Sequence, residues 1–277
     1  MNNEALIRLS FFFATLVVMS VLEVMSPRRR LTTSKPVRWF SNLGIVLIST
    51  VTLRWIFPLL AIDLSLIAQE KQWGLLNNYN MPGWLEVVIG VLILDLIIYL
   101  QHLMVHTVPA LWNFHMMHHA DLDIDLTTGL RFHPIEIYFS MGIKMAAVAV
   151  FGPSPLAVLI FEVVLNTTAM FNHSNFILPI GFDRVLRLFV VTPDMHRVHH
   201  SVIIRETNSN FGFNFPWWDR LFGTYRAQPA AGHEGMTIGL SQFRDPKRLT
   251  LPWMLALPFI GDPGHYAINR RGKEPLK

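Results

Sequence analysis

The stretch WLEVVIGVLILDLIIYLQHL, residues 84–103, is an apolar run with a histidine at its end. Its length matches what an α-helix needs to cross a hydrocarbon core about 30 Å thick. His106 follows His102 by one helical turn, so both imidazoles lie on one face of the helix. The sequence therefore predicts a membrane span that carries two histidines at one end.

The composition agrees with a membrane location. Of 277 residues, 52% are hydrophobic and only 15% are charged, whereas soluble domains carry about 25% charged residues. The net charge is +4, and the basic residues cluster beside apolar stretches. This pattern favours anionic lipid at a cytoplasmic face over nucleic acid. Without cysteine, the chain has no disulfide, thiolate ligand or cysteine nucleophile.

Three other apolar stretches are expected to enter the bilayer. Residues 6–25 are interpreted as an anchor rather than a signal peptide, because SPRRR and no cleavage site follows. Residues 43–68 are interrupted by Arg54, Pro58 and Asp63, and either span with a kink or place their second half at the interface. Residues 137–171 are expected to form a hairpin broken by GPSP at 152–155. The basic loop after residue 25 is predicted to be cytoplasmic.

The predicted fold is an all-α integral membrane protein with about four transmembrane or re-entrant helices and a cytosolic helical cap. We expect anchor helices in residues 1–80, a domain of membrane helices with a histidine-rich cap in 81–230 and a C-terminal cytosolic tail in 231–277. The last nine residues, NRRGKEPLK, have the composition of a solvated tail.

The motif His-x-x-His-His occurs twice, in WNFHMMHH (112–119) and PDMHRVHH (193–200). Each copy is preceded by a proline that suits the first turn of a helix, at Pro109 and Pro193. One such cluster is compatible with a solvent-facing surface. Two copies and the 102/106 pair favour neutral imidazoles that bind a cation.

The eight histidines of these motifs exceed the four ligands of a tetrahedral zinc, so we expect two metals. Each His-x-x-His-His helix is expected to offer ligands to both. Imidazole ligands are compatible with zinc, copper, iron or nickel.

Further polar residues extend the candidate site. His173 follows a polar stripe on an apolar helix, and His133, before Pro134, is either a ligand or a cap residue. His233 and His265 are interpreted as surface histidines. Five polar residues are candidates for orienting ligands or bound water: Asp95, Glu162, Asn166, Asp194 and Asp219.

These motifs resemble the fatty acid hydroxylase and sterol desaturase superfamily. The resemblance covers about residues 95–225 and rests on the three histidine motifs in order. Its further elements are DLIIYLQHLMVH, LRFHPIE, NHSNF, TPDMHRVHHS and ETNSNFGFNFPWWDRLFGTY. The first ninety residues resemble only generic spans.

The resemblance implies an integral-membrane oxygenase with a histidine-ligated di-iron centre at the cytosolic face. Such enzymes use O₂ and electrons to hydroxylate, or sometimes desaturate, lipid-like substrates. The motif positions that it marks as ligands are His102, His106, His115, His118, His119, His196, His199 and His200. His173 matches an additional ligand position, and His133 matches a recurrent HPxE element. Zinc is an expected substitute for iron in a preparation.

Electrons are expected from a separate reductase, ferredoxin or cytochrome. The chain has no dinucleotide-binding GxGxxG, no cysteine for an iron–sulfur cluster and no cytochrome b5-like segment. Four arginines are candidates for docking this donor, unless they form a solvated or headgroup-facing surface: Arg184, Arg187, Arg197 and Arg205.

Two alternative functions remain at this stage. A metal transporter or metal store is expected to place its ligands near the membrane midplane, away from span ends. A zinc hydrolase needs an open zinc and a general base, and HExxH is absent from the sequence. The sequence leaves open the lipid substrate, the choice between hydroxylation and desaturation, and the oligomeric state.

Overall fold

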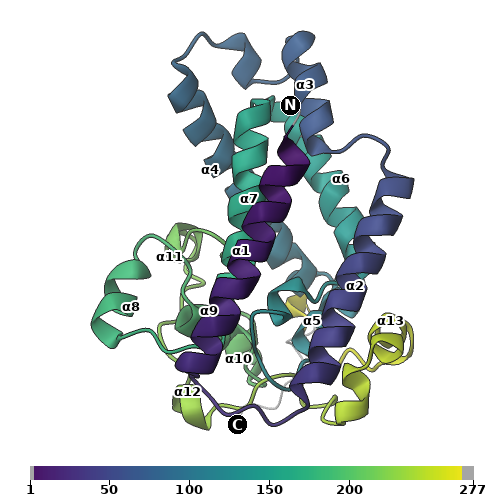
Figure 1. The fold of residues 1–277 in the computed structure, drawn as a ribbon, viewed down its shortest axis with the longest axis vertical. Helices are drawn as coiled ribbons and strands as arrows, with labels where there is room; N and C mark the ends of the chain where they lie inside the picture. Colours follow the sequence, from purple (N-terminus) through teal and green to yellow (C-terminus); the bar gives the residue numbers. More distant parts are fainter. Residues whose placement is uncertain (1–2, 270–277) are drawn as a thin grey trace.

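The computed structural model describes residues 3–269, which form helices joined by loops (Figure 1). The described residues contain no β-strand, only two isolated bridges, so the predicted all-α class is confirmed. Residues 270–277 of the predicted solvated tail lie outside the described residues.

The long apolar helices are α1 (Glu4–Met25), α2 (Lys35–Ile56), α3 (Ala61–Glu70), α4 (Gly83–Thr107), α6 (Pro134–Phe151) and α7 (Pro155–Asn172). The other α-helices are α5 (Pro109–His119), α8 (Ile180–Leu186), α9 (Pro193–His199), α10 (Ile204–Thr207), α11 (Trp217–Leu221), α12 (Gly232–Gly235) and α13 (Leu251–Ile260). Short 3₁₀ turns are η1 (Leu76–Asn78), η2 (Thr128–Leu130) and η3 (Pro246–Leu249).

Five segments within residues 3–269 are long and apolar enough to cross a membrane, where the sequence predicts about four spanning or re-entrant helices. They are α1, the combined α2–α3 segment, α4, α6 and α7. Only 6% of the apolar window of α1 is buried inside the protein, so most of this helix is free to face lipid. The structure therefore has the features of a multi-pass membrane protein.

Proline and glycine end the helices as the sequence predicts. The chain breaks around Pro58 between α2 and α3, and at residues 152–154 between α6 and α7. Gly152 ends α6 with a φ of 61°, and a Cβ there would lie 2.5 Å from the Trp73 carbonyl oxygen. Glycine is therefore required where the loop before η1 crosses the tip of the hairpin.

α5 and the helices from α8 to α13 form a cap over one end of the helical bundle (Figure 1). α1 and α4 both pack on α7, and α3 packs on α6. α4 continues into the cap, where α5 and α13 share an apolar core that includes Trp112, Met117 and Met254. The end of α4 thereby brings His102 and His106 beside the histidines of the cap.

Arg38 fastens α2 to the loop after α5. Its guanidinium is fully buried, with Nε 2.8 Å from Asp121 Oδ1 and Nη1 2.5 Å from Asp125 Oδ2. A buried charge is stable only when it is paired and hydrogen-bonded in this way. Arg38 is therefore not available to lipid or to a partner, whereas Arg30 in the loop before α2 is exposed.

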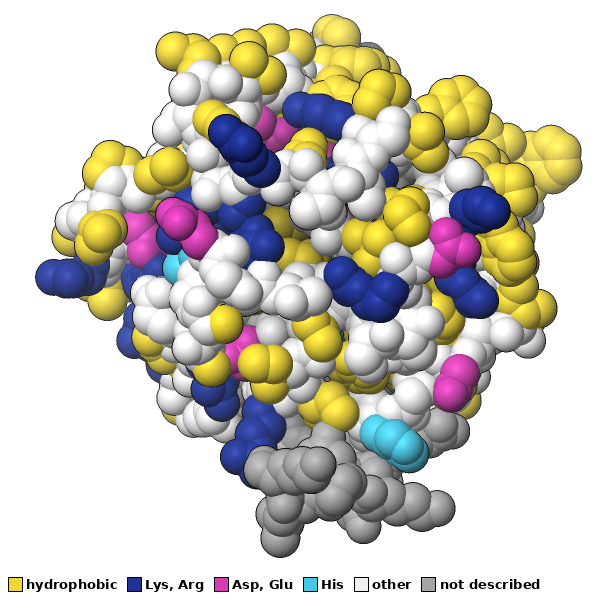
Figure 2. All heavy atoms as spheres, turned by 90° about the horizontal axis from the view of Figure 1, so that it is seen from below, with side chains coloured by type: hydrophobic (Ala, Val, Ile, Leu, Met, Phe, Trp, Pro, Cys, Tyr) yellow, Lys and Arg dark blue, Asp and Glu magenta, His cyan; other side chains and the backbone are white. Residues whose placement is uncertain are grey.

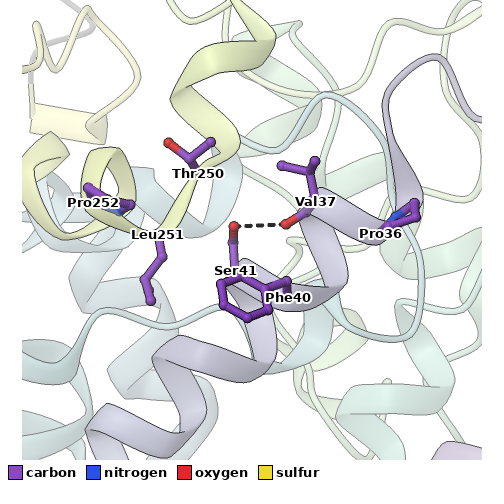
Figure 3. Close-up of a pocket in the computed structure, with 7 residues that line it drawn as sticks. All are labelled: Pro36, Val37, Phe40, Ser41, Thr250, Leu251 and Pro252. Carbon is purple, nitrogen blue, oxygen red and sulfur yellow. Dashed lines mark hydrogen bonds between the residues drawn. The ribbon is translucent and has the colours of Figure 1, made fainter.

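An apolar groove of about 370 Å³ lies between the starts of α2 and α13 (Figure 3). Its lining residues are Pro36, Val37, Phe40, Ser41, Thr250, Leu251 and Pro252. Its one hydroxyl from α2, on Ser41, donates to the Val37 carbonyl at 2.8 Å and so offers little to a polar ligand. The groove contains no histidine and is separate from the site described next.

Candidate metal centre

The nine histidines of the predicted ligand set, other than His133, form two buried groups. The first group is His102, His106, His115, His119 and His199. The second group is His118, His173, His196 and His200. Within each group, one ring nitrogen per residue lies within 4.8 Å of every other. We call these the five-histidine group and the four-histidine group.

The two His-x-x-His-His motifs serve the groups reciprocally. In α5, His115 and His119 join the five-histidine group while His118 joins the four-histidine group. The second motif, at the end of α9, has the reverse assignment: His199 joins the five-histidine group, and His196 and His200 join the four-histidine group. The expectation that each motif faces two metal positions agrees with this arrangement.

Local sequence explains where the motif helices begin. Pro109 and Pro193 each occupy the first turn of their helix, where a missing N–H costs nothing. The Thr192 side chain accepts a hydrogen bond from the Met195 amide at 3.4 Å and caps α9. His173 is the residue that ends α7.

Two histidines of the five-histidine group are oriented by backbone carbonyls. His102 Nδ1 lies 2.7 Å from the Phe211 oxygen, and His199 Nδ1 lies 2.7 Å from the Ser209 oxygen. A carbonyl oxygen only accepts, so each Nδ1 carries the proton. In the neutral ring, Nε2 is then left with a lone pair directed into the site.

The four-histidine group repeats this arrangement. His118 Nδ1 lies 3.2 Å from the Arg131 carbonyl oxygen, and His173 Nδ1 lies 2.7 Å from the Ala169 carbonyl oxygen. Both tautomers therefore also direct an Nε2 lone pair inward.

The Nε2 atoms face one another at distances that need a cation. His102 and His199 have their Nε2 atoms 3.1 Å apart, and His118 and His173 have theirs 3.2 Å apart. Two lone pairs at this distance repel and form no hydrogen bond. Three more inward Nε2 atoms have no hydrogen-bond partner, on His106, His115 and His119. The donor set therefore fits a metal ion in each group.

Burial keeps the cap imidazoles neutral. Desolvation and then the neighbouring histidines lower the pKa of His118, His119 and His200 well below the usual value. A neutral imidazole is the form that binds metal, so both motif helices present ligands ready for a cation.

Two side chains that the sequence did not single out also orient histidines. Glu136 Oε1 accepts from His115 Nδ1 at 2.7 Å, and Asn208 Oδ1 lies 3.1 Å from His106 Nδ1. Both support the five-histidine group. The position of Glu136 three residues after His133, in the HPxE element, was a usable signal for it.

Asp219 contacts the site only through the backbone. It accepts hydrogen bonds from the Phe211 and Gly212 amides at 2.8 and 2.9 Å, and the Phe211 carbonyl in turn orients His102. Asp95 accepts from Trp218 Nε1 at 2.7 Å. Neither carboxylate is hydrogen-bonded to a histidine in the described residues.

The other three polar candidates lie in different networks. Glu162 binds Lys144 at 2.6 Å and also pairs with Arg8, while the Asn166 side chain donates to the Glu162 carbonyl at 2.9 Å. Asp194 pairs with Arg28 at 3.2 Å and with Arg197. The contacts of Glu162 join α1, α6 and α7, and those of Asp194 join α9 to the basic loop after α1; none of them orients a ring of the two histidine groups.

His133 belongs to neither histidine group. Its Nδ1 accepts from the Ile135 amide at 3.2 Å at the start of α6, which corresponds to the cap alternative. His233 was interpreted as a surface histidine, but it is only 6% exposed. It lies 3.6 Å from Asp194, so that interpretation is wrong.

The proposed arginine docking surface is only partly available. Arg187 and Arg197 are 6% and 0% exposed and pair with Asp183 and Asp194. The prediction of a docking surface made of all four arginines is therefore wrong, because two of them are buried in ion pairs.

Two half-buried phenylalanines contact both histidine groups. The Phe132 ring stacks on His118 with centroids 4.4 Å apart, and the Phe213 ring lies 4.9 Å from His102 and 6.2 Å from His196. Phe213 also packs against the apolar core between the spans. It thus links the membrane-embedded core to the metal centre.

A helical membrane bundle with two buried groups of inward-facing imidazoles defines a multi-pass protein built to hold metal. A model of the Fatty acid hydroxylase family matches residues 87–224, about half of the chain, and this range contains both groups. The chain belongs to the fatty acid hydroxylase family.

Curated relatives share the same region. The chain is 32% identical over 149 residues to the ornithine lipid hydroxylase of Rhizobium tropici, covering 53% of this chain and 44% of that protein. It is 29% identical to human alkylglycerol monooxygenase, covering 63% and 39% of the two chains. For human cholesterol 25-hydroxylase the identity is also 29%, covering 51% of each.

The matches span about half or less of the length of these relatives. No solved structure matches the chain.

Proposed function

We propose that this protein is a membrane-bound di-iron oxygenase that hydroxylates a C–H bond of a lipid. The observation that carries the proposal is the set of facing Nε2 lone pairs, 3.1 and 3.2 Å apart, in two adjacent buried groups. Three relatives named as a lipid hydroxylase, an alkylglycerol monooxygenase and a cholesterol hydroxylase support a lipid substrate.

An apolar C–H bond offers nothing to an acid or a base, so the bound iron would supply the oxidation of the substrate by O₂. The protein's own part is to orient the imidazoles, and six of the nine rings are held through Nδ1 by a backbone carbonyl or a side chain. The buried Glu136 carboxylate would increase the electron donation of His115. Trp112 and Phe211, both fully buried, close the five-histidine group against water.

The lipid is proposed to reach the centre from the apolar core between the spans. Phe213 contacts this core on one side and a histidine of each group on the other. Phe132 lies 6.4 Å from Phe213 and stacks on His118. These two rings would position the acyl or sterol carbon that reacts.

Electrons are proposed to come from a separate donor on the cytoplasmic side. Arg28 pairs with Asp194, and Arg29 donates to the His233 and Met236 carbonyls, so the basic loop lies against the cap. Lys and Arg side chains are spread over the cap face of the molecule (Figure 2). Under the positive-inside rule this face is cytoplasmic.

The proposal is tested with the purified protein in lipid nanodiscs. Expected results are about two iron atoms per chain and O₂ consumption that depends on both reductant and lipid. Mass spectrometry should find a lipid that gains one oxygen atom; the loss of two hydrogen atoms would instead indicate desaturation. His118→Ala should abolish turnover, whereas Glu234→Gln, at an 84% exposed side chain, should not.

Activity that continues without O₂ and with zinc alone would refute the proposal in favour of a hydrolase. Metal flux into sealed vesicles without lipid oxidation would refute it in favour of a transporter.

A further inference from the structure

α8 (Ile180–Leu186) and its C-cap residue bury one ion pair, while the apolar side chains of the helix point outward. Asp183 and Arg187 pair with each other and are 8% and 6% exposed. Ile180, Phe182 and Val185 are 77%, 57% and 59% exposed. A helix that borders water has the opposite arrangement. The outer face of α8 therefore suits an apolar medium.

The same surface continues over α11. Trp217 Nε1 donates to the Leu188 carbonyl at 2.7 Å and joins α11 to the end of α8. Leu221 and Phe222 follow on the outside, 69% and 51% exposed. We call the outer face of α8, with Leu221 and Phe222, the apolar flank. Large exposed surfaces of this kind mark sites of interaction with a membrane or a protein.

α11 is attached to the middle of a membrane-spanning helix. Trp218 Nε1 donates to Asp95 of α4 at 2.7 Å, and the Phe222 ring stacks on Tyr99 with centroids 5.5 Å apart. Asp95 and Tyr99 lie about 18 and 24 Å along α4 from its start at Gly83, at a rise of about 1.5 Å per residue. Both positions fall within the ~30 Å hydrocarbon core that a span beginning at Gly83 crosses.

We propose that the apolar flank is embedded in the bilayer leaflet nearest the cap, with lipid acyl chains as its occupant. The flank lies directly against α4, because Phe222 stacks on the buried Tyr99. Arg184 and Arg220 are exposed beside it, and long basic side chains of this kind reach from an apolar surface to lipid phosphates.

Figure 1 shows α8 projecting from the side of the bundle next to α11. The flank would thus add a membrane contact that does not cross the bilayer to the five candidate spans. It would also hold the cap at the depth where lipid chains reach the metal centre without leaving the membrane. The contact itself does not depend on the reaction proposed above.

The absence of cysteine makes the test direct, because a single introduced thiol is the only labelling site. Phe182→Cys and Val185→Cys carry a nitroxide spin label in the full-length, metal-loaded protein, reconstituted in phosphatidylcholine and phosphatidylglycerol nanodiscs. Val17→Cys on α1 is the lipid control, matched to Phe182 at 58% exposure. Glu234→Cys in the cap is the water control.

The measurement compares collisions of each label with O₂, which concentrates in lipid, and with a water-soluble nickel chelate. Labels at 182 and 185 should give the O₂-to-nickel ratio of position 17, several-fold above that of position 234. A ratio equal to that of position 234 would overturn the proposal.

Spin–spin broadening that disappears on dilution with unlabelled protein would also overturn the proposal, because a second copy would then cover the flank. Metal content equal to that of the unlabelled chain verifies that each labelled variant is folded. If the labelled Phe182→Cys variant binds less metal than the unlabelled chain, the labelled Val185→Cys variant decides the outcome, because replacing valine by cysteine changes the side chain less.

Discussion

Glu136→Gln should weaken metal binding selectively in the five-histidine group. The Glu136 carboxylate and the His115 ring are 6% and 1% exposed, so their hydrogen bond of 2.7 Å is shielded from water. Glutamine keeps an oxygen that accepts from Nδ1 but removes the negative charge. His115 then becomes a weaker donor to the metal, while its position is retained.

The expected loss is about 10- to 100-fold in metal affinity, the usual effect of removing a group that orients a ligand. This corresponds to about 1.4–2.7 kcal/mol. In the four-histidine group, His118 and His173 are instead oriented by the Arg131 and Ala169 carbonyls. Its affinity should therefore remain close to that of the unmodified protein.

The assay equilibrates the protein with chelators of graded affinity and counts bound metal by mass spectrometry. Glu136→Gln should release one metal at a weaker chelator than the unmodified protein, and the second metal at the same chelator. The control is Glu206→Gln, which changes a buried carboxylate that accepts from the Ala230 amide and has no hydrogen bond or ion pair with a histidine in residues 3–269. Equal loss of both metals, or none, would refute the assignment of Glu136 to one group.

Three further outcomes are expected. His133→Ala should leave metal content unchanged and lower the free energy of unfolding by about 1 kcal/mol through loss of a helix cap, whereas His133→Asn should retain most of that stability. Thermal unfolding measures the stability and metal analysis measures the metal content; loss of metal from His133→Ala would contradict the cap assignment. Phe213→Ala should retain both metals and change which lipid carbon is oxidised, as read from product mass spectra. An unaltered product pattern would contradict the proposal that Phe213 positions the lipid. Burial raises the pKa of Asp219 to about 6, above its unfolded value of about 3.9. Its contribution to stability is therefore full below about pH 4 and lost as the pH rises to about 6, so the melting-temperature difference between the unmodified protein and Asp219→Asn should shrink across that range; a constant difference would contradict it.

The sequence predicted the helices well because their ends are set by local chemistry. Pro109, Pro155 and Pro193 each stand at the first position of a helix, and Gly152 adopts the left-handed conformation that ends α6. Apolar length likewise identified the spans. Local signals of this kind act within one helical turn and need no knowledge of the fold.

The candidate site was predictable in its members but less so in its arrangement. The sequence predicts that each His-x-x-His-His motif offers ligands to two metals, but helical spacing does not predict which of His115, His118 and His119 joins which group. The buried environment of His233 was missed for a related reason. Its contact with Asp194 comes from a segment about forty residues earlier, which no local pattern reports.

The two histidine groups differ in whether a substitution can remove the hydrogen-bond partners of their rings. In the four-histidine group, the hydrogen bonds found for His118 and His173 end on main-chain oxygens, which every amino acid supplies. In the five-histidine group, Glu136 and Asn208 are side chains that a single codon change replaces. A single substitution can therefore change how His115 or His106 is oriented, whereas His118 and His173 are held by the course of the backbone whatever residues supply it.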